Sequence, residues 1–180
     1  MKTRDSKGFT LIELLIVVAI IGIIAAIAVP GLLRARMSGN EASAIGSLRA
    51  INSGEAAYSS SCAAGGYAQT LEDLVKPATG SSQGFVSPDL SKTDVVKSGF
   101  IVNLAAGDSP VVVTVKANTC NAAAADAQST YFAKADPVKY AGTGNRHFGT
   151  DARGTIFQDT TDTALTATTL ATSGTVAPVQ

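Results

Sequence analysis

The sequence predicts an α+β protein, in which one long N-terminal α-helix packs on an antiparallel sheet of roughly four strands. Two observations lead to this class. The first 33 residues form the most apolar block of a chain that is 46% hydrophobic, which is typical of a membrane-length helix. Short runs rich in valine, isoleucine and aromatic residues, separated by turn residues, follow from about residue 99 and indicate strands.

The chain begins with a basic segment and continues into the apolar run. Residues 1–8 hold three basic side chains and one acidic side chain, a net charge of +2, which favours the cytoplasmic side of a membrane. Leu11 to Val29 is 19 residues, close to the thickness of the hydrocarbon core. Glu13 lies inside this run, where a charge costs a few kcal/mol or more.

Two ordinary interpretations leave Glu13 unexplained. A secretory signal peptide has a basic start, an apolar core and a small-x-small cleavage site, which Ala26 to Ala28 provides. A membrane anchor accounts for the length of the run, and Glu13 near its cytoplasmic end would extend toward the headgroups. Neither interpretation gives a reason for an acidic residue at this position.

The segment KGFTLIELLIVVAIIGIIAAIAVP, residues 7–30, resembles the class III signal of type IV pilins and of type II secretion pseudopilins. The resemblance covers about the first third of the chain and rests on Gly8, Phe9, Glu13, Gly22 and Pro30. It implies that a prepilin peptidase removes a leader, residues 1–8, by cutting between Gly8 and Phe9, and then methylates the new amino terminus of Phe9. It also implies an assembly role for Gly22 to Pro30, a stretch of helix that often opens in fibres of the family.

The resemblance gives Glu13 a physical role. The amine freed on Phe9 carries a positive charge at the head of an apolar helix. In a fibre of packed helices, the Glu13 carboxylate of a staggered neighbour can pair with that amine in a medium of low dielectric constant. Because neither charge is stable there alone, the pair favours correct register.

The helix is expected to continue past the apolar part, residues 9–33, to about Ser60. Pro30 and Gly31 should kink it or open it locally, because proline removes a backbone donor. In the second half, residues 34–60, Ile45, Leu48 and Ile51 share one face that needs a partner, and Glu41 is expected among the polar positions elsewhere.

Residues 61–159 are expected to form a globular head whose sheet covers this face. Thr70 to Val75 is predicted to be a short helix with Thr70 as N-cap and Asp73 as its capping-box partner. The predicted strands are residues 99–106, 111–120 and 129–138 and a hairpin within 145–159 that turns at Asp151 to Gly154. In an oxidising compartment Cys62 and Cys120 can form a disulfide; two unpaired buried thiols are the alternative.

The tail, residues 160–180, is rich in threonine and alanine, and we expect it to be weakly ordered. An edge strand and an O-glycosylated surface segment are alternatives.

The sequence shows no catalytic motif. His147 is the only histidine, and we expect it to be a surface or packed residue rather than a base or a ligand. The acids Glu72, Asp73, Asp159 and Asp162 are expected to be solvated. We predict no enzyme activity, no cofactor, no metal site and no direct nucleic-acid site, and the calcium motif of the major pseudopilins cannot be placed.

The function predicted from the resemblance is that of a structural subunit of a helical homopolymer, a type IV pilus-like filament for adhesion, motility or DNA uptake. The precursor would wait in the inner membrane with its head on the periplasmic side and need an inner-membrane assembly platform and a motor. A pseudopilin of a type II secretion system is the alternative within the family. A membrane-anchored or secreted periplasmic domain that does not polymerise is the alternative outside it.

Overall fold

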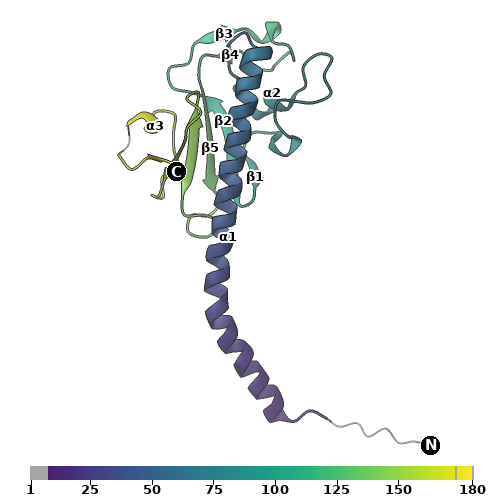
Figure 1. Cartoon of the computed structure of the whole chain (residues 1–180), viewed down its shortest axis with the longest axis vertical. Coiled ribbons are helices and arrows are strands. Elements are labelled where there is room, and N and C mark those ends of the chain that lie inside the picture. Colours follow the sequence, from purple (N-terminus) through teal and green to yellow (C-terminus); the bar gives the residue numbers. More distant parts are fainter. Residues whose placement is uncertain (1–7, 173, 180) are drawn as a thin grey trace, which may run out of the picture. The chain divides into compact units, whose positions relative to one another are not determined.

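A computed structural model of the chain describes residues 8–172 and 174–179 (Figure 1). The chain divides into two compact units, Met1–Arg36 and Met37–Gln180, and helix α1, Leu11–Ser61, runs through both. The predicted α+β class is confirmed, because the second unit combines the end of this helix with an antiparallel sheet.

Helix α1 is continuous in its hydrogen-bonded structure. Pro30 lies inside it and the helix is not interrupted there, so the expected local opening is absent from this single chain. Proline removes only one intrahelical hydrogen bond, and the bonds on either side hold the turn. The buried face of the second half includes Leu48 and Ile51 as predicted, while Ile45 is half-buried.

The main sheet has six antiparallel strands in the order β1-β2-β5-β6-β7-β8, two more than predicted. Their bounds are β1, Val95–Lys97, β2, Phe100–Ala106, β5, Tyr131–Pro137, β6, His147–Asp151, β7, Ile156–Asp159, and β8, Ala177–Pro178. The predicted hairpin is confirmed as β6 and β7, with register pairs from His147 and Asp159 to Thr150 and Ile156. The unpredicted strands β1 and β8 are edge strands of three and two residues, too short to give a periodic pattern.

The prediction of a sheet strand over residues 111–120 is wrong. Within this range only Val112–Thr114 forms a strand, β3, and it pairs with β4, Ala127–Gln128, in a separate two-stranded sheet, while η2, Lys116–Asn118, is a 3₁₀ helix. Local contacts hold this segment at the end of α1, since the Thr114 hydroxyl donates to the Ala63 carbonyl. Its valines remain exposed.

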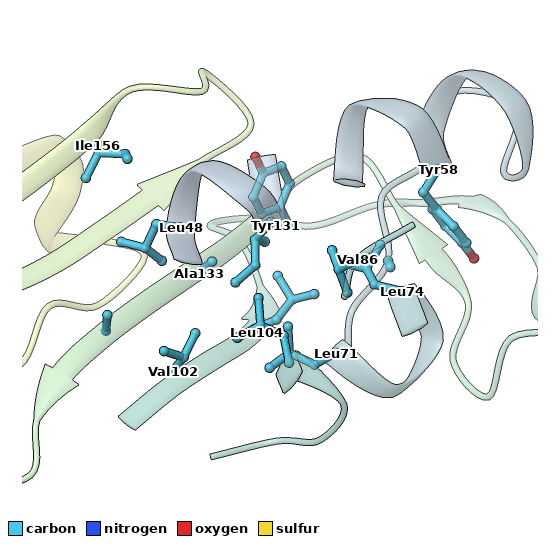
Figure 2. Close-up of a cluster of buried hydrophobic side chains, with 14 of the residues drawn as sticks. Leu48, Tyr58, Leu71, Leu74, Val86, Val102, Leu104, Tyr131, Ala133 and Ile156 are labelled. Carbon is cyan, nitrogen blue, oxygen red and sulfur yellow. The ribbon is translucent and has the colours of Figure 1, made fainter. Parts of the chain in front are cut away.

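One face of the main sheet packs on α1, and the core lies between them (Figure 2). Leu48 and Tyr58 reach into it from α1, and Val102 and Ala133 from β2 and β5. The short helices α2, Leu71–Val75, and η1, Pro88–Leu90, close the same core with Leu71, Leu74 and Leu90.

The opposite face of the sheet is partly covered by the tail, which is more ordered than predicted. Leu165 and Leu170 are buried against Phe132 of β5, and Leu170 belongs to the short helix α3, Thr169–Thr172. Beyond it, β8 pairs with β7, so the edge-strand alternative is the one found. Gly149 of β6 provides the space for Leu165, because a Cβ at position 149 would lie 3.2 Å from Leu165 Cδ1.

Candidate functional site

The two residues of the predicted cleavage site, Gly8 and Phe9, precede α1 and are exposed. Gly8 to Thr10 have no regular structure, and a Cβ added at Gly8 would meet no atom within 4 Å. The Phe9 side chain is 91% exposed. The bond between Gly8 and Phe9 is therefore reachable in this conformation, while the rest of the predicted leader lies outside the described residues.

Thr10 and Glu13 form a reciprocal capping box at the start of α1. The Glu13 carboxylate accepts from the Thr10 amide at 2.9 Å and from the Thr10 hydroxyl at 2.8 Å, and the Glu13 amide donates to that hydroxyl oxygen at 3.3 Å. Both groups satisfy polar atoms that the first turn of a helix leaves unpaired. This capping role was not predicted, although the Thr-x-x-Glu spacing of Thr10 and Glu13 signals it.

Within the described residues, nothing covers the apolar part of α1. From Leu11 to Leu33 its large apolar side chains are 49% to 81% exposed. By length and composition this helix can cross a membrane, with a mean hydropathy of 3.1 over its best window and none of that window buried. Such a surface needs lipid or other apolar helices around it.

Gly22 and Pro30 lie within this exposed helix. A Cβ at Gly22 would meet no atom within 4 Å, so nothing in the single chain requires a glycine there. The predicted assembly role of both residues stays a prediction.

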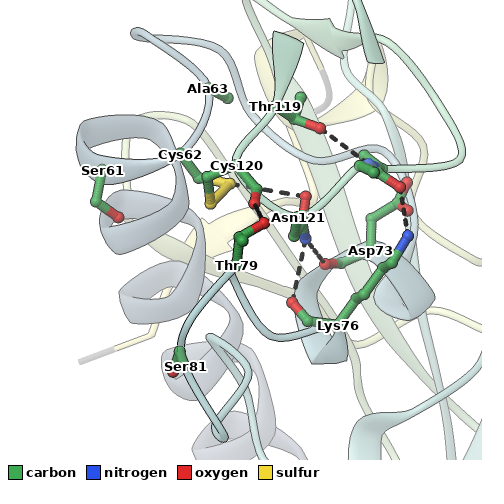
Figure 3. The surroundings of a disulfide bond; sticks show 12 residues. Ser61, Cys62, Ala63, Asp73, Lys76, Thr79, Ser81, Thr119, Cys120 and Asn121 are labelled. Atoms are coloured by element: carbon green, nitrogen blue, oxygen red, sulfur yellow. Dashed lines mark hydrogen bonds between the residues drawn. A yellow bond between two sulfur atoms is a disulfide. The ribbon is translucent and has the colours of Figure 1, made fainter. Parts of the chain in front are cut away.

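Cys62 and Cys120 form a disulfide directly after the end of α1 (Figure 3). The two residues are 58 apart in sequence, and the Cys120 amide also donates to the Cys62 carbonyl at 3.1 Å. The bond ties the helix end to the loop after η2, so the disulfide is found rather than the alternative of two unpaired thiols.

Asp73 of α2 lies near the disulfide (Figure 3). It is buried, whereas the sequence predicted a solvated side chain. Its amide donates to the Thr70 hydroxyl at 3.2 Å, which confirms the N-cap. The expected return bond to Thr70 is replaced, because the Asp73 carboxylate accepts from the amides of Ala124 at 2.6 Å and Ala125 at 3.2 Å. Asn121, beside the disulfide, donates to the Asp73 carbonyl at 2.8 Å.

Two carboxylates, Glu41 and Glu55, lie on the buried face of α1, where the sequence pattern predicts apolar residues. Glu41 pairs with Arg146 at 2.7 Å and accepts from the Asn145 amide at 2.8 Å. Glu55 is fully buried; burial raises its pKa to about 8, against the opposing effect of the hydrogen bond from the Ala68 amide. The Glu55 side chain is therefore largely protonated at neutral pH.

His147 is packed, as predicted, and joins a polar cluster on the sheet face away from α1. Its Nδ1 lies 2.7 Å from Asp136 Oδ1, and the ring stacks on Tyr140. Burial opposes ionisation of Asp136, but hydrogen bonds from His147 and Lys134 outweigh it and keep the pKa of Asp136 below its usual value. Asp159 is also buried rather than solvated, because it accepts from Thr161 and Thr175.

Among the described residues no group of three His, Cys, Asp or Glu side chains is placed to hold a metal ion. A groove of 640 Å³ lies beside α1 and α2, and its lining carries no charged side chain. These features offer no catalytic constellation, so the exposed N-terminal segment is the candidate functional site.

Residues 3–29 match the family model of the prokaryotic N-terminal methylation motif. The segment therefore carries an N-terminal methylation motif, which supports the predicted class III signal, and the match is limited to this part of the chain. The chain is also similar to the type IV wide pilus major component PilA4 of Thermus thermophilus, with 63% identity over 38 residues. This alignment spans 21% of the chain and 29% of that relative, and no solved structure matches the chain.

Proposed function

We propose that the chain is a structural subunit that polymerises through its N-terminal helix into a type IV pilus-like filament. The observation that carries the proposal is the exposed apolar surface of α1 from Leu11 to Leu33, most of which lies within the methylation motif of residues 3–29. Removing this surface from lipid requires an apolar substitute, and identical helices packed side by side supply one.

We infer that a prepilin peptidase cuts between Gly8 and Phe9 and methylates Phe9. The exposure of both residues supports this inference. The precursor then spans the inner membrane with its head on the periplasmic side, and an assembly platform and a motor supply the work of extraction. Mass spectrometry of the mature chain tests this step, with methylated Phe9 as the expected N-terminal residue and a start at Val29 or an uncut Met1 as contrary results.

A filament experiment tests polymerisation. Cells that express the chain are sheared, and the supernatant is examined for long fibres containing it. Extracellular fibres that disappear on deletion of the chain support a pilus. A secretion defect without surface fibres would instead identify a type II secretion pseudopilin.

A further inference from the structure

Arg34 and Arg36 lie where the apolar part of α1 ends. Leu11 to Leu33 is 23 residues, so this part of the helix is about 34 Å long, slightly more than a hydrocarbon core of about 30 Å. Arg34 follows at once and Arg36 lies about 3 Å further along the axis. In a chain that spans a membrane, both side chains therefore start at the level of the lipid headgroups.

Neither arginine has an anionic partner among the described residues. Both are exposed, and neither makes a side-chain hydrogen bond or an ion pair there. The nearest acid along the helix is Glu41, which is buried and already bound by Arg146 at 2.7 Å and by the Asn145 amide. The charge of the two guanidinium groups must be balanced from outside the chain.

The angular positions of the two residues indicate what surrounds them. Residues two apart on an α-helix are separated by about 200°, so Arg34 and Arg36 leave α1 on opposite sides. A partner protein that docks on one side of the helix can reach only one of them. A headgroup layer surrounds the helix completely, and guanidinium groups bind phosphate oxygens in a bidentate manner.

We propose that Arg34 and Arg36 form a cationic collar that binds the phosphate groups of anionic phospholipids where α1 leaves the membrane. The proposal rests on the membrane-spanning precursor proposed above. The collar fixes the depth of the helix, and extraction of the subunit must break its contacts with the lipids.

The test uses the full chain reconstituted in vesicles of phosphatidylglycerol and phosphatidylcholine. Electron paramagnetic resonance of spin-labelled lipids gives the preference of the chain for phosphatidylglycerol. We expect this preference to fall about twofold or more in Arg34→Gln/Arg36→Gln, and the wild-type preference to weaken in high salt. Arg49→Gln is the matched control, because Arg49 is an exposed arginine of the same helix 13 residues beyond Arg36, and it should leave the preference unchanged.

Three outcomes overturn the collar, and they are distinguishable. If the double variant keeps the wild-type preference while both chains stay in the vesicles after an alkaline carbonate wash, the collar is wrong and the membrane span stands. If the wild type washes off, the span itself and the proposed function fail with it. If the double variant changes self-association in neutral detergent without lipid, as measured by sedimentation, the arginines bind carboxylates of a second copy instead.

Discussion

Glu13 is already hydrogen-bonded within the single chain, before any partner subunit is present. Its carboxylate takes the amide and hydroxyl hydrogens of Thr10, so the first turn of α1 contains no unpaired acid. Glu13 therefore has two roles. As a helix cap it needs only a hydrogen-bond acceptor, whereas the proposed pairing with the Phe9 amine needs a negative charge.

Two substitutions separate these roles. Glu13→Gln keeps a side-chain acceptor for the capping box but removes the charge, so processing should survive and fibres should be lost or weakened. Thr10→Ala removes the cap at a cost of about 1 kcal/mol but keeps the charge, so fibres should persist. The measurements are mass spectrometry of the N-terminus and the amount of sheared fibre. Normal fibres from Glu13→Gln would remove the pairing argument.

Glu55 makes the stability of the head depend on pH. Its pKa is about 8 in the folded chain and near 4.5 in the unfolded chain, so the folded state holds a proton that the unfolded state releases between these values. The free energy of unfolding should fall as pH rises through this window, by up to about 1.4 kcal/mol per pH unit. It should level off above about pH 8.

Glu55→Gln should flatten this decline, because the amide keeps an acceptor for the Ala68 N–H and cannot ionise. Urea unfolding of the full chain in detergent, followed by tyrosine fluorescence, measures the effect; all four tyrosines lie beyond residue 57. Asp108→Asn, at an exposed acid, is the control and should leave the slope unchanged. An unaltered slope in Glu55→Gln would show that another group causes the pH dependence.

At the scale of elements, the tail depends on a glycine in β6. A Cβ at Gly149 would lie 3.2 Å from Phe132 Cε2 and from Leu165 Cδ1 and 3.3 Å from Leu170 Cδ2. The two leucines anchor an otherwise polar segment, which explains why a stretch rich in threonine and alanine folds onto the sheet. Strand β6 faces the two leucines, and it therefore needs a residue without a side chain at position 149.

Gly149→Val should therefore displace the tail and leave the other face of the sheet intact. We expect faster amide exchange across residues 160–172 and a loss of about 1–3 kcal/mol from overpacking. Hydrogen–deuterium exchange by mass spectrometry resolves the two faces. Gly46→Ala on α1 is the control, since a Cβ there meets nothing within 4 Å, and it should be neutral or slightly stabilising.

The elements that the sequence predicted are those with a local signal. The stripe of Leu48 and Ile51 identified the buried face of α1, and the hairpin at Asp151 to Gly154 followed from its turn residues. Strands β1 and β8 were not predicted, because they form by pairing with β2 and β7, and their own two or three residues give no signal. The valines around β3 suggested a sheet strand, but contacts with the end of α1 decide where that segment lies.

The candidate site was predictable in part for the same reason. The spacing of Gly8, Phe9 and Glu13 is local and marks the methylation motif. The burial of Glu41 is not predictable from the local pattern, because its partner Arg146 is 105 residues away in the sequence. Glu55 is buried and has no cationic partner among the residues that the structure describes, an arrangement that its neighbours in the sequence do not indicate.

At the scale of the whole molecule, the disulfide adds a second covalent link, besides the backbone, between the end of α1 and the head. Its reduction should lower the free energy of unfolding by about 2–4 kcal/mol, because the bond restricts 58 residues of the unfolded chain. Urea unfolding with and without reductant measures the difference. Cys62→Ala/Cys120→Ala is the control, because this variant should unfold at lower urea and should no longer respond to reductant.

The position of this bond also determines how the subunit carries mechanical load. Tension that enters through α1 and leaves through the C-terminal segment crosses directly from Cys62 to Cys120, so residues 63–119 lie outside the loaded path. About 200 Å of extended chain is thereby excluded from any lengthening under force. While the disulfide is intact, a filament of such subunits would not lengthen through residues 63–119 when it is pulled.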